Sequence, residues 1–239
     1  MASTYSSDLK LELITTGEKA GTWGTITNTN LQQLEQAASG YISHNIGAAD
    51  LALDLSNGAV SNGKNLYFKL TGTLTANRTM TMPDSAERVF VVEDATARSS
   101  SNYTLTVKTV SGTGLTLPVG STTLLYSDGT NITGKLQTKG YYTPSATYTT
   151  VNGDQVLIDT SGGGIGTAIT INLPASPAIG NEVTFIDSGN NLASNNLTVG
   201  RNGQPINGTA SNLVVSTNAA AFTLVYVNAT RGWVYKDKI

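Results

Sequence analysis

The sequence predicts a mainly β protein, built from two repeated, antiparallel, sandwich-like β modules that follow a short N-terminal segment. Three observations predict this fold class. From residue 47 onward, short runs of β-favouring residues are separated by turn signals such as Asn62-Gly63, Asp128-Gly129 and Asn152-Gly153. The two halves of that region resemble each other. The polar residues are mostly uncharged, with 36 Thr and 21 Asn in 239 residues.

The composition narrows the classes of function. Charged residues make up 13% of the chain, against about 25% in ordinary globular proteins. A neutral surface of hydroxyls and amides suits a close-packed assembly, in which buried charges are costly. The net charge of -2 gives no electrostatic reason to expect nucleic acid or an anionic membrane as a partner. The chain has no Cys, which excludes disulfides and zinc–thiolate sites.

The apolar runs and the N-terminal residues also indicate where in the cell the protein is expected. No run of residues is apolar over the roughly 18 positions that a membrane span needs. The first residues, MASTYSSDLK, lack the basic and apolar regions of a secretory signal. We therefore expect no membrane span, and assembly in the cytoplasm of the cell that makes the protein.

The first domain is predicted to be an attachment segment at residues 1–46. Leu9, Leu11 and Leu13 alternate with charged residues, as in a short strand. After a glycine-punctuated loop that contains Trp23, a helix is expected. Its signals are a capping box from Thr29 to Gln32, an apolar face with Leu31, Leu34, Ala37 and Ala38, and a stop at Gly40. One strand and one short helix cannot close a core, so the segment must dock on the β modules or on a partner.

The two β modules are predicted at residues 47–138 and 139–239. Their candidate strands are 65–71, 78–82, 88–93, 103–110, 122–126, 155–160, 168–173, 182–186, 196–200, 212–216, 221–227 and 232–236. Residues Lys139–Thr150 are expected to be the linker, because Gly140 and Pro144 interrupt the pattern there.

Five segments of the first module match segments of the second in the same order. The insertions between them fall in expected loops. A duplicated module therefore explains the two halves. The matched segments are 62–72 with 152–162, including Leu66-Tyr67-Phe68 with Val156-Leu157-Ile158; Met80–Pro83 with Ile171–Pro174; Phe90–Asp94 with Val183–Asp187; Leu105–Val107 with Leu197–Val199; and Leu124–Tyr126 with Leu224–Tyr226.

The second module is unusually neutral. Between Ser188 and Thr230 the one charged residue is Arg201. A monomer usually carries several charges over such a length. Two readings remain open: much of this surface faces another subunit, or the exterior is simply rich in Thr and Asn.

The sequence offers little for catalysis, so we expect no enzymatic activity, no cofactor and no metal. The single histidine, His44, has no G-x-S-x-G elbow to accompany it, and an exposed linker residue is expected. The run Gly162–Gly166 precedes a strand rather than the helix that a phosphate loop needs. The acidic residues are scattered, so a depolymerase with paired carboxylates remains only an alternative.

Aromatic residues near the C-terminus are candidates for sugar or receptor contact, since sugar faces stack on aromatic rings. Trp233 and Tyr235 are expected on one face of a strand. Tyr226 has an apparent counterpart in Tyr126, which favours a core position for that residue. Packing in the core is the competing interpretation for the whole group.

Residues 8–41, DLKLELITTGEKAGTWGTITNTNLQQLEQAASGY, resemble an N-terminal segment of tail-fibre and related virion proteins of tailed bacteriophages, notably marine and cyanobacterial ones. The matching features are Leu-Glu-Leu followed by T-G, then G-T-W-G, T-N-T-N-L and a short helix that ends in G-Y. The second module, from Gly153-Asp154 to Arg231-Gly232-Trp233, is similar to β domains of the same class. The first module matches more loosely.

The resemblance implies a virion structural protein, a tail fibre or receptor-binding appendage. It implies attachment to the particle through the N-terminal segment, with Leu9, Leu11, Leu13, Trp23, Leu31 and Leu34 as attachment residues. It also implies a homotrimer in which strands from three chains share a core, other tail or capsid proteins as partners, and a host surface glycan or protein as a possible target. The alternatives are a capsid decoration or head-fibre protein and a stand-alone sugar-binding adhesin.

Overall fold

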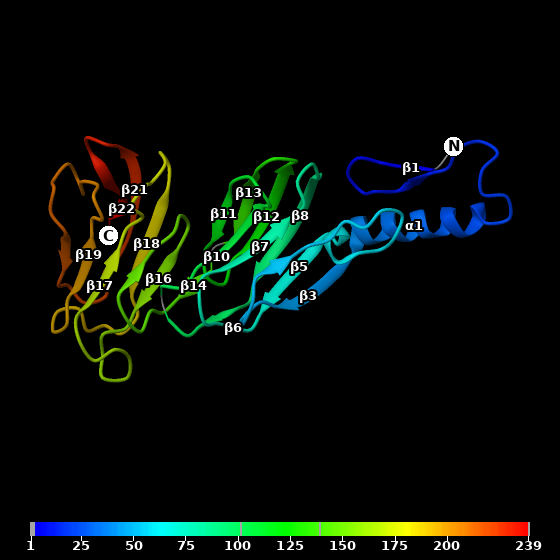
Figure 1. The fold of residues 1–239 in the computed structure, drawn as a ribbon. Helices are drawn as coiled ribbons and strands as arrows, with labels where there is room; N and C mark the ends of the chain where they lie inside the picture. The colour runs from blue at the N-terminus through cyan, green and yellow to red at the C-terminus, as the bar shows by residue number, and fades with distance from the viewer. Residues whose placement is uncertain (1–2, 101, 139, 239) are drawn as a thin grey trace. The chain divides into compact units, whose positions relative to one another are not determined.

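The computed structural model describes residues 3–100, 102–138 and 140–238, and it is mainly β with one α-helix, α1 (Trp23–Ser39) (Figure 1). The predicted β class is therefore confirmed. The chain divides into two compact units. Residues up to 97, with 104–117 and 121–138, form the first unit, and 98–103, 118–120 and the residues from 139 onward form the second.

The first unit contains α1, a 3-10 turn and the first thirteen strands. Its elements are β1 (Thr4–Tyr5), β2 (Glu12–Leu13), α1, β3 (Tyr41–Asn45), β4 (Leu51–Ala52), η1 (Asn62–Lys64), β5 (Tyr67–Thr71), β6 (Thr73–Leu74), β7 (Arg78–Met82), β8 (Glu87–Asp94), β9 (Ala97–Arg98, its second residue in the other unit), β10 (Leu105–Thr109), β11 (Gly114–Leu117), β12 (Thr122–Asp128) and β13 (Ile132–Thr138).

The strands of the first unit form a short solenoid of stacked coils. One sheet has the order β13-β12-β8-β5-β3, and the other has the order β11-β10-β7-β4. The chain alternates between the sheets, so that β3 with β4, β5 with β7, and β8 with β10 each make one coil. Within each sheet these coil strands pair in parallel. Strands β11, β12 and β13 then add antiparallel pairs at the end of the stack.

The second unit repeats this topology strand for strand. Its sheets have the orders β14-β16-β18-β21-β22 and β15-β17-β19-β20, again with three parallel coil strands followed by antiparallel ones. The predicted internal repeat is confirmed. The strands are β14 (Tyr141–Tyr142), β15 (Tyr148–Thr149), β16 (Gln155–Ile158), β17 (Ile169–Asn172), β18 (Glu182–Asp187), β19 (Leu197–Gly200), β20 (Leu213–Val215), β21 (Ala221–Asn228) and β22 (Gly232–Lys238).

The prediction of antiparallel sandwich-like modules is wrong in its strand pairing, and the modules are parallel coils with antiparallel ends. The physical reason is that the Asn-Gly signals mark places where the chain turns but do not say where the next strand pairs. The turns at Asn62-Gly63 and Asn152-Gly153 carry the chain to the opposite sheet, and the next coil then pairs in parallel with the previous one. Such pairing joins residues far apart in the sequence, so local turn chemistry does not encode it.

The residues predicted to be a linker form the first coil of the second unit. Strands β14 and β15 both lie within Lys139–Thr150, although Lys139 itself is outside the described residues. The equivalent strand in the first unit is β3, which follows α1 directly. The first coil of each unit thus begins at a Gly-Tyr pair, Gly40-Tyr41 or Gly140-Tyr141, and both tyrosines are 60% exposed.

The sequence match between β12 and β21 is misaligned by one residue. In β12 the core-facing residue is Leu125, which pairs with Phe90, whereas in β21 it is Leu224, which pairs with Val183. Because side chains alternate along a strand, this slip reverses the face. Tyr226 is therefore buried, and Tyr126 lies on the opposite, outer face.

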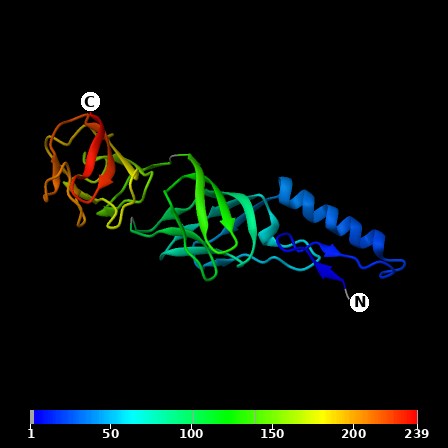
Figure 2. The same cartoon turned by 90° about the horizontal axis from the view of Figure 1, so that it is seen from above.

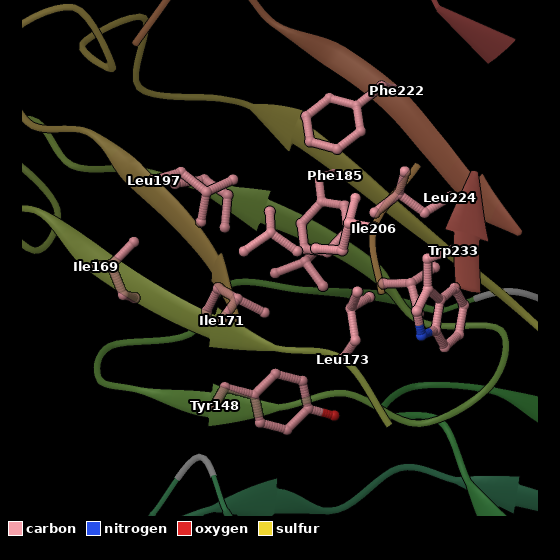
Figure 3. Packing of buried hydrophobic residues seen from close by; sticks show 14 of the residues in the cluster. Tyr148, Ile169, Ile171, Leu173, Phe185, Leu197, Ile206, Phe222, Leu224 and Trp233 are labelled. Carbon is pink, nitrogen blue, oxygen red and sulfur yellow. The ribbon is translucent and has the colours of Figure 1, made fainter. Parts of the chain in front are cut away.

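Each unit closes its core with its own strands. In the second unit the side chains from both sheets point toward one another, as Figure 3 shows. Phe185 stacks on Phe222 at 5.1 Å, and Trp233 meets Tyr226 edge-on at 5.6 Å. Phe68 and Phe90 make a similar contact at 5.9 Å in the first unit. The shared core of three chains that the resemblance implies is therefore not needed to bury these residues.

Helix α1 begins earlier than the capping pattern predicts and ends where predicted. It starts at Trp23, and Thr29 lies inside it with its hydroxyl donating to the carbonyl of Thr25 at 3.0 Å. Gly40 ends it in an extended conformation. In the described part of the chain no helix is long and apolar enough to cross a membrane.

Candidate functional site

Helix α1 is held to the rest of its unit by its polar face. The Asn30 side chain makes two hydrogen bonds to the backbone of Glu12 in β2, at 2.9 and 3.0 Å. One turn further on, the amide of Gln33 accepts from Lys64 in η1. After another turn the Gln36 amide donates to the carbonyl of Ser61 at 2.9 Å. Figure 2 shows the N-terminal strands beside α1.

Lys64 is the buried centre of this docking. It is fully buried, and its ammonium donates to Gln33 Oε1 and to the carbonyls of Ser56 at 2.7 Å and Ala59 at 2.6 Å. Burial lowers the pKa of Lys64 to about 8. Arg88 supports the same turn by donating to the carbonyls of η1 and of the residue after it.

The apolar face of α1 points away from these contacts and is exposed. Trp23 is 63% exposed, Leu31 57% and Leu34 43%. Thr27 and Ala38 are exposed on the same side. Surface helices of globular proteins normally bury the apolar face and expose the polar one. In α1 the docked side is instead largely polar, and Trp23, Leu31 and Leu34 are left exposed.

Four of the exposed residues of α1 follow the spacing of a coiled-coil seam. Thr27, Leu31, Leu34 and Ala38 are separated by four, three and four residues, the repeat that places side chains along one line of a helix. We call Thr27, Leu31, Leu34 and Ala38 the α1 seam. Trp23 lies one turn before Thr27.

The other predicted attachment residues lie in the N-terminal strands. The alternation of Leu9, Leu11 and Leu13 yields only a two-residue strand, β2, which pairs with β1. Leu13 is 51% exposed, while Leu9 and Leu11 are half-buried. Of the six predicted residues, the structure brings Leu31 and Leu34 into one continuous surface.

A second apolar surface, which the sequence analysis missed, lies on the outer face of the first unit. Tyr41, Tyr67, Val91 and Leu124 stand side by side in register across β3, β5, β8 and β12. We call these four residues the outer row. The Tyr41 and Tyr67 rings stack at 5.7 Å, and Tyr41 follows α1 after a single glycine. The signal in the sequence was Gly40-Tyr41, which matches Gly140-Tyr141.

The two charged side chains beside the outer row, Lys69 and Glu93, neutralise each other. Lys69 and Glu93 form an ion pair at 2.9 Å, and the Tyr67 hydroxyl donates to Glu93 at 2.8 Å. The hydrogen bond from Lys69 is the main cause that lowers the pKa of Glu93. The face therefore presents apolar side chains and a compensated pair of charges.

The corresponding row of the second unit is polar. Strand pairing places Tyr141, Gln155, Thr184 and Thr223 in line across β14, β16, β18 and β21. The Thr184 and Thr223 hydroxyls are hydrogen-bonded to each other at 3.0 Å. Two units with one topology thus differ in their outer rows, and the apolar row belongs to the unit that carries α1.

The two C-terminal aromatic candidates have different environments. Trp233 is fully buried in the core of the second unit, so it cannot contact a receptor or sugar in this fold. Tyr235 is half-buried, packs edge-on against Phe222 at 5.6 Å and lines a pocket of about 330 Å³. The pocket also includes Leu213, Val215 and the polar loop 216–218.

The expectation for His44 is wrong, because it lies in strand β3 rather than in an exposed linker. Its ring is half-buried, its Nε2 atom is buried without a hydrogen-bond partner, and burial lowers its pKa. Within the described ranges no three His, Cys, Asp or Glu side chains gather into a group that could hold a metal ion.

Comparisons with known proteins do not assign the chain to a family. No family model and no curated protein matches the chain. A solved structure of a chaperone–substrate complex aligns with 82% of this chain at 11% sequence identity and a TM-score of 0.34. The aligned part spans 36% of that other chain. A similarity this weak carries no argument about function.

Proposed function

We propose that this chain is a non-enzymatic structural protein of a virus particle, a tail fibre or receptor-binding appendage that is attached through its N-terminal segment. The observation that carries the proposal is the reversed docking of α1, which leaves Leu31 and Leu34 exposed. An exposed apolar face on a docked helix indicates a protein–protein contact. The resemblance of residues 8–41 to phage virion proteins supports the choice of a virion.

The test compares incorporation into particles. An epitope-tagged chain is expected to co-purify with assembled particles, whereas a Leu31→Asn/Leu34→Asn variant is expected to fold and remain unassembled. The matched control is Ile179→Asn, because Ile179 is 79% exposed and belongs to the second unit. Normal incorporation of the double variant would contradict attachment through α1.

Labelling of the particles separates the two virion locations. Immunogold on the tail supports the fibre or appendage. Label on the capsid instead supports a decoration or head-fibre protein. Deletions used in such work should end by residue 39, because β3 (Tyr41–Asn45) pairs with β5 in the sheet of the first unit.

The pocket at Tyr235 favours a second function, the binding of a host glycan. Its lining combines aromatic and aliphatic side chains with Ser216, Thr217 and Asn218, and it includes no charged residue. A neutral sugar offers an apolar ring face and hydroxyl groups to such a pocket. We expect Tyr235→Ala to abolish any glycan-array signal of the wild type, and Tyr141→Ala, at an exposed tyrosine outside the pocket, to retain it.

A further inference from the structure

The loop 216–220 of the second unit, which joins β20 to β21, lines the pocket at Tyr235. Its counterpart in the first unit is the loop 118–121 between β11 and β12. Each loop ends on the same backbone hydrogen bond at 2.8 Å, to the carbonyl of Ala220 in the second unit and of Ser121 in the first. The donors are the N–H groups of the last residues of β18 and β8. This correspondence allows the two loops to be compared residue by residue.

Ala219 holds a backbone conformation that alanine rarely adopts. Its φ angle is +56°, and the corresponding residue of the first unit is Gly120, with a φ angle of +71°. Glycine adopts a positive φ angle without steric cost, whereas a Cβ atom makes this conformation unfavourable. Strained residues of this kind concentrate at catalytic and ligand-binding sites, where the surrounding structure enforces them. The second unit thus keeps a strained methyl group in the lining of the pocket.

Two hydrogen bonds to other parts of the second unit hold the loop in this conformation. The Ala219 N–H donates to Asp187 Oδ2 at 2.9 Å, and the Ala193 N–H donates to Asn218 Oδ1 at 2.7 Å. A pocket that is fixed in advance loses little conformational entropy on binding. Its volume of about 330 Å³ is near the lower end of the range for small-molecule sites, roughly 300–1,000 Å³. The pocket therefore suits one sugar residue.

The lining of the pocket pairs a hydrogen-bond donor with small apolar groups. Because Asn218 Oδ1 accepts from Ala193, the amide nitrogen of Asn218 is left as the donor of that side chain. Among the described residues this nitrogen makes no hydrogen bond. Ala219, Ala220 and Ala221 follow directly in the lining and carry only methyl side chains. An acetamido group offers the two matching features, a carbonyl oxygen that accepts a hydrogen bond and a methyl group.

Other classes of sugar match this lining less well. An unsubstituted hexose has no methyl group to place against the alanines. A 6-deoxyhexose has a methyl group but no carbonyl oxygen beside it. Sialic acids, uronic acids and free amino sugars carry a charge, and no charged residue of the described chain lines the pocket to compensate it.

We infer that the pocket binds a neutral N-acetylhexosamine, with the acetamido group against Asn218 and the alanines 219–221 and one face of the sugar ring against Tyr235. This inference rests on the glycan binding proposed above, and it names the class of sugar. The aromatic ring supplies the stacking surface that sugars share, and the loop 216–220 supplies the selection for the acetyl group.

Saturation-transfer difference NMR on the purified full-length chain tests the class of sugar, without particles. The probes are the methyl glycosides of N-acetylglucosamine, N-acetylgalactosamine, glucose and glucosamine. An N-acetylated probe should bind at least roughly tenfold more tightly than glucose and glucosamine, and its acetyl methyl protons should receive the largest saturation. Equal binding of the four probes overturns the inference and leaves glycan binding standing. No binding of either N-acetylated probe also overturns the inference, and a glycan-array signal from other sugars would then still support glycan binding.

A matched pair of variants tests the place of the acetamido group. Asn218→Asp keeps the oxygen that accepts from Ala193 but replaces the donor nitrogen with a carboxylate oxygen. The variant should therefore keep its fold and bind the N-acetylated probe at least roughly tenfold more weakly. Asn228→Asp makes the same change outside the pocket, where Asn228 Oδ1 also accepts from backbone N–H groups, at 2.7 and 3.0 Å. It should bind like the wild type, and equal binding by the two variants overturns the placement at Asn218.

Ala219→Gly tests the strained methyl group. Glycine relieves the strain at this φ angle, so the variant should unfold at a higher temperature than the wild type. It should also show a smaller preference for N-acetylated over unsubstituted sugars, because the methyl contact is lost. A variant that keeps the full preference would show that the Ala219 side chain does not select the acetyl group.

Discussion

At the residue scale, Lys64 joins α1 to the rest of the first unit. Replacing it with Met removes the donor for the buried Gln33 Oε1 atom and for the carbonyls of Ser56 and Ala59. Buried acceptors without partners are costly, so we expect a loss of about 2–4 kcal/mol in the free energy of unfolding of the first unit. Urea unfolding of the full chain measures it. Lys69→Met is the matched control, because its ion pair with Glu93 is partly exposed and should contribute much less to stability. Similar losses for both variants would contradict this role of Lys64.

His44 should make the stability of the first unit fall in mild acid. Burial lowers its pKa in the folded state below the value of 6.5 that it has when unfolded. Above pH 7 the ring is neutral in both states. As the pH falls through 6.5, the unfolded chain takes up the proton first, so the free energy of unfolding decreases.

The comparison with His44→Gln isolates this effect. The chain has a single His, and the carboxylates titrate in both proteins. The difference in urea midpoint between pH 7.5 and pH 5 should therefore be larger for the wild type. Parallel pH profiles would show that the ring is solvated in the folded state.

At the element scale, Gly40 ends α1 and begins the first module. A Cβ atom there would clash with the carbonyl oxygen of Gln36 and lie 2.6 Å from Asn65 Oδ1. We expect Gly40→Ala to cost about 1–3 kcal/mol through overpacking, measured by thermal unfolding. Gly24→Ala, inside α1 with no atom within 4 Å of the new Cβ, should instead stabilise the helix by roughly 0.5–1 kcal/mol.

The sequence predicted individual elements better than their pairing. All twelve candidate strands coincide with strands of the structure, since β-branched runs between turn residues are local signals. Nine strands were missed, most of them only two residues long, and β3 also carries polar residues such as His44. The missed strands are β1, β3, β4, β6, β9, β11, β13, β14 and β15. Parallel pairing between coils was missed because it depends on contacts distant in sequence.

The candidate surface was predicted only in part for a related reason. Helical periodicity identified the face with Leu31 and Leu34, but not whether that face is buried. The answer depends on Asn30, Gln33 and Gln36, whose amides bond to backbone groups and to Lys64. Amide side chains at such spacing look like an ordinary solvated face in a sequence. Only the tertiary structure shows that they form the docked side.

At the scale of the whole molecule, the repeat means that each module has a complete set of coils. The core of the second unit draws on strands β16 to β22 and on Tyr148. We therefore expect residues 139–239 to fold alone and to unfold in one cooperative urea transition. Trp233 is the one tryptophan of this fragment, and it is fully buried. Its fluorescence should be blue-shifted in the folded fragment and shift to the red on unfolding.

Two substitutions test whether this core alone stabilises the fragment. Leu224→Ala removes a fully buried side chain and should lower the free energy of unfolding by about 2–5 kcal/mol. Val214→Ala, at a position that is 57% exposed, should change it by less than about 0.5 kcal/mol. A fragment with red-shifted emission and no cooperative transition would show that the second module needs residues outside 139–239 to close its core. The two modules would then share a topology, but the second would not be stable by itself.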